Sequence, residues 1–96
     1  MKSYFVYILK CSDKSYYTGI SNNLEKRIAE HNFGEDKNSY TYSRRPVELV
    51  YSQYFAEAAI AIQREKQIKG WSRAKKEALI KGDFDEIVRL SKRKSK

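Results

Sequence analysis

Arg27 and His31 are polar residues at positions where a helix is expected to turn apolar side chains inward. At about 100° per residue, both share one side of a helix with Leu24 and Ile28. A buried guanidinium needs a partner or a ligand, and His31 is the only histidine of the chain. The alternative is that the stripe ends at the edge of a sheet, where Arg27 extends its charge into solvent. Together, one turn apart, the two side chains indicate a site.

A carboxylate, Glu65, interrupts a second apolar helix face. The apolar positions of that face are Ala58, Ala61, Ile62 and Ile68. Glu65 lies near the middle of this arc, and a charged side chain is rarely buried there without a partner. Two explanations stay open, an ion pair with Arg27 and coordination of a cation. Mg²⁺ is usually held by one or two carboxylates plus substrate phosphate, with waters completing its octahedron.

Two tyrosines, Tyr7 and Tyr17, stand in strand-like segments on either side of one turn. A turn with an odd number of residues, such as 12–14, directs both side chains to the same sheet face, whereas an even number separates them. Taken alone, two strand tyrosines are ordinary core residues. Gly19 weakens the second strand unless another group has to approach its backbone closely.

The elements that position these residues follow from the apolar patterns and the turn signals. We predict strands at 4–11, 15–21 and 47–55, and helices from Leu24 to about Phe33, at 57–69, at 72–80 and from 83 to about 90. Residues 35–45 predict a mobile loop with room for one helical turn. The order β-β-α-β-α-α, with a last helix after it, predicts an α/β (α+β) fold: a three-stranded antiparallel sheet flanked by helices. We expect one domain over residues 1–82, followed by a C-terminal helix and basic tail over 83–96.

The composition indicates a polyanionic partner. The 96 residues are enough for one domain and carry a formal net charge of +8. This excess favours nucleic acid, because neutralising phosphates releases counterions. The alternative is simply a soluble basic protein. No apolar run approaches the roughly 20 residues that span a membrane, so no membrane partner is expected. The first residues lack a signal-peptide layout, which predicts a cytoplasmic location.

The residues in these patterns resemble the GIY-YIG nuclease superfamily, most closely its small stand-alone bacterial members, which are largely uncharacterised. The corresponding segments are Phe5-Val6-Tyr7, Tyr17-Thr18-Gly19, Asn23-Leu24-x-x-Arg27, His31 and Arg64-Glu65-x-x-Ile68-Lys69-x-Trp71. The resemblance covers residues 4 to about 80. Each half-motif alone identifies the family only weakly, whereas five elements in order at the family's spacing identify it specifically.

The chain departs from the family pattern at four points. Phe5 replaces the first glycine, Thr18 replaces an isoleucine, and Ile20 stands where some members carry a lysine. Many members also have a late asparagine in the site, and this chain has none after Asn38. These departures bear on turnover more than on the fold.

The resemblance implies a divalent-metal-dependent endonuclease. It makes Tyr7, Tyr17, Arg27 and His31 catalytic residues and Glu65 the ligand of one Mg²⁺ or Mn²⁺ ion. One tyrosine would take the proton of the attacking water, Arg27 would bind the phosphoryl oxygens, and the ion would lie near the leaving oxygen. Cleavage would leave a 5′-phosphate and a 3′-hydroxyl. Tyrosine has an ordinary pKa of about 10, so we expect nearby positive charge to lower it.

Basic and aromatic side chains around the site are candidates for substrate contact. They are Lys37, Arg44, Arg45, Arg73, Lys75 and Lys76 for phosphates, and Tyr40 and Tyr42 for stacking on bases. A solvated surface is the alternative for each. We expect DNA, branched or damaged forms included, rather than RNA. The second candidate function is a binding module that does not cut, or that depends on a protein partner.

Overall fold

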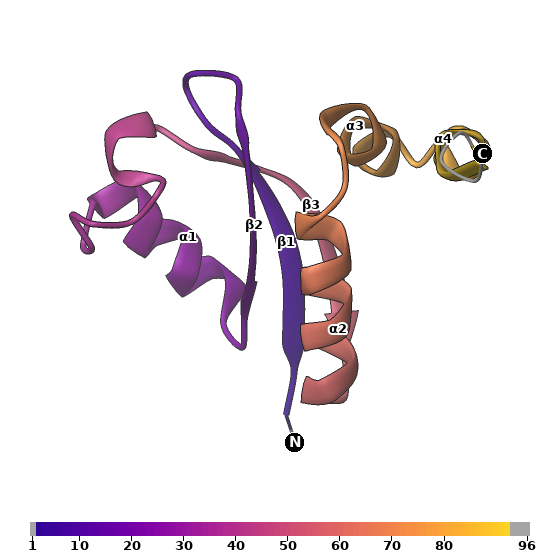
Figure 1. Ribbon diagram of the computed structural model, residues 1–96. Helices are drawn as coiled ribbons and strands as arrows, with labels where there is room; N and C mark the ends of the chain where they lie inside the picture. Colours follow the sequence, from indigo (N-terminus) through magenta and orange to yellow (C-terminus); the bar gives the residue numbers. More distant parts are fainter. Residues whose placement is uncertain (1, 93–96) are drawn as a thin grey trace.

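The computed structural model describes residues 2–92, which form a three-stranded sheet with helices on both faces (Figure 1). Strand β1 (Tyr4–Lys10) is central and pairs antiparallel with β2 (Tyr16–Ser21) and β3 (Glu48–Phe55). The helices are α1 (Leu24–Phe33), α2 (Ala58–Lys69), α3 (Arg73–Lys81) and α4 (Phe84–Lys92), with a 3₁₀ turn η1 (Tyr42–Arg44). The predicted fold class and element order are confirmed.

Both faces of β1 are buried, because α1 and α2 cover the sheet from opposite sides (Figure 1). Tyr7 and Leu9 point toward α1, whereas Val6 and Ile8 point toward α2. The apolar core is thus split into two clusters, one on each face of the sheet. This arrangement explains why β1 reads as a continuous apolar run rather than an alternating one.

Helix α1 has the predicted ends because both caps are encoded locally. The Asn23 side chain accepts a hydrogen bond from the backbone N–H of Lys26, and Gly34 ends the helix in the left-handed conformation with φ 74°. The helix follows β2 after two residues, so its inner face lies over the hairpin. That placement brings His31 to the tyrosines of the strands.

The segment predicted as a mobile loop is braced at several points. It contains the one predicted helical turn, η1. The Asn32 side chain accepts from the backbone N–H of Val47 at 2.8 Å and donates to its carbonyl at 3.2 Å. Arg44 donates to Asp13 of the β-hairpin at 3.0 Å. Composition alone did not predict this bracing, because it depends on partners distant in sequence.

Helix α4 packs against α3 at the far end of the molecule, away from α1 (Figure 1). Of the predicted basic tail, residues 93–96 lie outside the described part of the chain. The domain boundary at residue 82 stays a prediction. Within residues 2–92, no helix has the length and apolar character needed to cross a membrane.

Candidate active site

The hairpin brings Tyr7 and Tyr17 to one face of the sheet. Tyr7 pairs with Gly19 and Leu9 with Tyr17, so the side chains of Tyr7 and Tyr17 share a face. Their ring centroids are 6.3 Å apart. A Cβ on Gly19 would lie 2.5 Å from the Tyr7 hydroxyl oxygen. Gly19 is therefore the close-approach glycine that the sequence suggested, because the Tyr7 ring lies across its backbone.

Helix α1 places His31 against the buried Tyr7 hydroxyl. The side chain of His31 is buried, and its Nε2 lies 3.0 Å from the Tyr7 oxygen. Its Nδ1 lies 2.8 Å from the hydroxyl oxygen of Thr41, which is also buried. The prediction that His31 faces inward is confirmed. Each of its ring nitrogens has a hydrogen-bond partner.

Arg27 extends its charge into solvent, as in the alternative in which the apolar stripe of the helix ends at the edge of the sheet. Its side chain is 44% exposed and forms an ion pair with Glu30 at 3.3 Å. Its guanidinium also acts as a hydrogen-bond donor toward the Tyr7 hydroxyl, which raises the pKa of Arg27. Arg27 is thus a solvent-facing cation that lies over the buried Tyr7–His31 pair.

Burial governs the protonation of this pair. It raises the pKa of Tyr7 to about 12, and the hydrogen bond from Arg27 only partly opposes that effect. The expectation that positive charge would lower the pKa of this tyrosine is wrong for Tyr7, because desolvation disfavours the phenolate more strongly. Burial, followed by the charge of Arg27, lowers the pKa of His31 below its ordinary value of 6.5. Both side chains are therefore neutral at pH 7.

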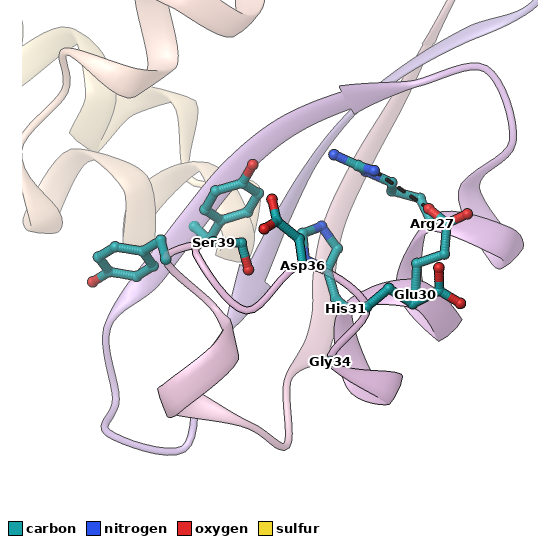
Figure 2. A pocket seen from close by; sticks show the side chains of 9 residues that line it. Arg27, Glu30, His31, Gly34, Asp36 and Ser39 are labelled. Atoms are coloured by element: carbon teal, nitrogen blue, oxygen red, sulfur yellow. Dashed lines mark hydrogen bonds and ion pairs between the residues drawn. The ribbon is translucent and has the colours of Figure 1, made fainter.

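A hollow of about 500 Å³ opens above this pair. Its lining residues are Tyr17, Arg27, Glu30, His31, Gly34, Glu35, Asp36, Ser39 and Tyr40. Figure 2 shows Arg27 and Glu30 on one side, Ser39 on the other, and His31 and Asp36 between them. The Tyr40 ring is stacked 6.1 Å from that of Tyr17. The pocket combines one exposed cation, three carboxylates, one neutral imidazole and two aromatic rings.

Glu65 lies on α2 and does not line this pocket. Its side chain is 13% exposed, and its carboxylate pairs with Lys69 at 2.7 Å. Of the two alternatives left open for Glu65, the ion pair with Arg27 is not formed, because the two residues lie on helices that cover opposite faces of the sheet. The charge of Glu65 nevertheless raises the pKa of Tyr7. The two groups are within electrostatic reach of each other.

The buried face of α2 is narrower than predicted. Ala61 and Ile68 are fully buried, whereas Ile62 is 42% exposed. The inner stripe therefore follows Ala61, Glu65 and Ile68, with Ile62 outside it. This register strengthens the observation that a carboxylate occupies a core-facing position.

The arginines predicted to contact phosphate from the loop have structural partners. Arg44 stacks on the Tyr40 ring at 3.8 Å, in addition to its ion pair with Asp13. Arg45 stacks on Tyr42 at 4.4 Å. Lys37 is exposed near the pocket-lining Asp36.

The basic residues of α3 lie on the α2 side of the sheet and do not line the pocket. Arg73 pairs with Glu77 at 3.1 Å and lies over the Tyr16 ring. Lys75 lies over the Trp71 ring. Partial burial lowers the pKa of Lys76.

Thr41, Ser39 and Glu30 were not predicted as members of the site. All three lie in the pocket or directly behind it. In a polar loop, the sequence pattern does not distinguish a threonine or serine that belongs to a site from one that is simply solvated. Their roles depend on the path by which the loop returns to α1.

The family assignment follows from comparison with known proteins. A family model described as "GIY-YIG catalytic domain" matches residues 3–78. This chain belongs to the GIY-YIG family. The match contains all five residues to which the resemblance gives a catalytic or metal-binding role. It ends before α4, which begins at Phe84.

Relatives within this nuclease-like family share about half of their residues with the chain. A UPF0213 protein of Syntrophus aciditrophicus is 51% identical over 81 residues, covering 84% of this chain and 93% of the relative. A UPF0213 protein of Natronomonas pharaonis is 49% identical over 77 residues, covering 80% and 89%. These names state no activity or substrate.

Two solution NMR structures have a fold similar to that of this chain. A protein from E. faecalis superposes with a TM-score of 0.60 at 34% identity, covering 85% of this chain and 86% of that one. A UPF0213 protein from Bacillus halodurans superposes with a TM-score of 0.55 at 38% identity, covering 82% and 83%.

Proposed function

We propose that this GIY-YIG protein is a divalent-metal-dependent endonuclease that hydrolyses phosphodiester bonds in DNA. The observation that carries the proposal is the 3.0 Å hydrogen bond between the buried Tyr7 hydroxyl and His31, beneath the exposed guanidinium of Arg27. Hydrolysis needs an acceptor for the proton of water and a cation for the phosphoryl oxygens. These three side chains supply both.

Tyr7 and His31 act as a pair in this proposal. A pKa of about 12 keeps Tyr7 protonated at neutral pH, so its hydroxyl is not already ionised when the reaction begins. The attacking water gives a proton to the Tyr7 oxygen while Tyr7 gives its own proton to His31 Nε2. The lowered pKa of His31 keeps this nitrogen free to accept at pH 7. The net step moves one proton from water to the imidazole.

Arg27 controls access to that pair. Tyr7 has no exposed surface, and the Arg27 guanidinium lies against its hydroxyl. When Arg27 turns toward a phosphate in the pocket, it donates paired hydrogen bonds to the phosphoryl oxygens. The same movement uncovers the Tyr7 hydroxyl for the water. Substrate binding and proton acceptance are thereby coupled through one side chain.

Glu65 is the proposed ligand of a single Mg²⁺ or Mn²⁺ ion. Its carboxylate supplies the hard oxygens that these ions prefer, and it is partly open to solvent. Within residues 2–92 no three His, Cys, Asp or Glu side chains converge as a metal site, so Glu65 would be the one carboxylate that holds the ion. Bound to Glu65, the ion would supply positive charge to the scissile phosphate. Lys69 pairs with the same carboxylate and would have to release it.

The test is cleavage of labelled single-stranded, duplex, flap and four-way-junction DNA, and of matched RNA, with Mg²⁺ or Mn²⁺. We expect metal-dependent cleavage of DNA with 5′-phosphate ends, and a loss of about 100-fold or more in Tyr7→Phe and Glu65→Gln. Tyr54→Phe, on the exposed side of β3, and Glu57→Gln, at the start of α2, are the matched controls and should cut normally. DNA that is bound and left uncut would favour the binding-module alternative.

A further inference from the structure

The hydroxyl of Thr41 lies directly behind the imidazole of His31. Its side chain is fully buried, and its Oγ1 lies 2.8 Å from His31 Nδ1. The hydroxyl of Ser39 lies 3.2 Å from the same oxygen. These contacts extend the Tyr7–His31 hydrogen bond into a chain of four side chains. The last two come from the loop between α1 and β3.

Counting protons assigns the direction of the Tyr7–His31 hydrogen bond. The proton of the buried Tyr7 hydroxyl needs an acceptor, and His31 Nε2 is the one within reach in the described structure. If Nε2 carried the proton instead, it would donate to the Tyr7 oxygen. The Tyr7 proton would then be buried without a partner.

We infer that Thr41 is a positioning residue, which accepts a hydrogen bond from His31 Nδ1–H and so keeps Nε2 unprotonated toward Tyr7. The Thr41 hydroxyl also shares a hydrogen bond with the Ser39 hydroxyl, in which either group can donate. Through this tautomer Thr41 controls whether His31 can take a proton. Its effect on cleavage rests on the proposed function, whereas the tautomer is a property of the folded protein alone.

The loop around Thr41 is held firmly enough for this role. Thr41 immediately precedes η1 and accepts the backbone N–H of Arg44 at 3.0 Å. The Arg44 guanidinium donates to the Tyr40 carbonyl at 2.7 Å and to Asp13 at 3.0 Å. Backbone and side-chain contacts therefore fix the residues on both sides of Thr41. Its hydroxyl has little freedom to move away from His31.

The charged and titratable groups around His31 do not depend on the Thr41 hydroxyl. They are Tyr7 from β1, Tyr17 from β2, Arg27 and Glu30 from α1, and Glu35 and Asp36 from the loop. Thr41→Val removes the hydroxyl at nearly constant volume and leaves all of them in place. Thr41→Ser keeps the hydroxyl.

The test is the tautomer of His31, read from two- and three-bond ¹H–¹⁵N correlations in ¹⁵N-labelled protein at pH 7.5. His31 is the only histidine, so its two ring nitrogens give the only imidazole signals. We expect protonated Nδ1 in the wild type and in Thr41→Ser, and a shift toward protonated Nε2 in Thr41→Val. Protonated Nε2 in the wild type, or an unchanged tautomer in Thr41→Val, would overturn the inference.

Cleavage provides the second readout. We expect kcat to fall by about 10- to 100-fold in Thr41→Val with KM nearly unchanged, and to recover in Thr41→Ser. An unchanged tautomer together with a lower kcat would also refute the role given to Thr41. If the wild type cuts no nucleic acid, the proposed function fails while the tautomer still decides the inference.

Discussion

Replacing Gly19 by alanine should displace the Tyr7 ring. The new Cβ would lie 2.5 Å from the Tyr7 hydroxyl oxygen and 2.6 Å from Cζ, where ordinary contacts begin at 3.4 Å. The ring, fully buried and held by His31, would have to retreat by about 1 Å. Overpacking of this kind costs about 1–3 kcal/mol. For a domain of this size we expect Tm to fall by roughly 4 to 20 °C.

The same displacement should impair the proposed chemistry. A retreat of about 1 Å lengthens the Tyr7–His31 hydrogen bond beyond its useful range, and misplacement on this scale costs about 100-fold in rate. The assays are thermal unfolding and DNA cleavage on Gly19→Ala. The matched control is Gly70→Ala, whose Cβ would meet its nearest neighbour at an ordinary 3.6 Å, with φ −82°. If Gly19→Ala is as stable and active as this control, the reasoning is refuted, because the close approach of Tyr7 would then not require a glycine at this position.

Two further predictions concern stability. The lowered pKa of His31 means that the unfolded chain binds more protons than the folded one between the folded-state pKa and about 6.5. The free energy of unfolding should therefore fall as pH falls through that window, and urea titrations should show a shallower dependence in His31→Gln. Asn32→Ala removes both hydrogen bonds to the backbone of Val47 and should cost about 1–3 kcal/mol. Asn38→Ala, exposed in the same region, should change stability by less than about 0.5 kcal/mol in the same titration.

The fold was predictable from sequence because its determinants are local. Asn23 and Gly34 define the ends of α1 through their own side-chain and backbone properties. The turn between β1 and β2 contains an odd number of residues, which fixed the shared face of Tyr7 and Tyr17. Such signals act within a few residues of one another. They do not require knowledge of tertiary contacts.

The electrostatics of the site could not be predicted in the same way. The pKa of Tyr7 depends on how completely three separate elements exclude water from its hydroxyl. The expectation that this pKa would be lowered was therefore wrong. The role of Glu65 stayed open between an ion pair and a cation ligand, because helical periodicity shows which face a residue occupies but not which helix lies opposite. The Thr41 contact depends on the return path of a loop. Each of these properties arises from packing between segments distant in sequence.

The charge of the pocket differs from the charge of the whole chain, and this difference constrains how a nucleic acid can bind. The chain carries a net charge of +8, yet among residues 2–92 Arg27 is the one arginine or lysine that lines the pocket, beside three carboxylates from Glu30, Glu35 and Asp36. Phosphates entering the pocket would meet net negative charge unless Arg27 leaves Glu30 or a divalent cation accompanies them. Under the proposed function, affinity for a nucleic acid would then come chiefly from basic side chains outside the pocket, whereas Arg27 would contact the phosphate to be cut. The proposal therefore assigns binding and cleavage to different parts of the charge distribution.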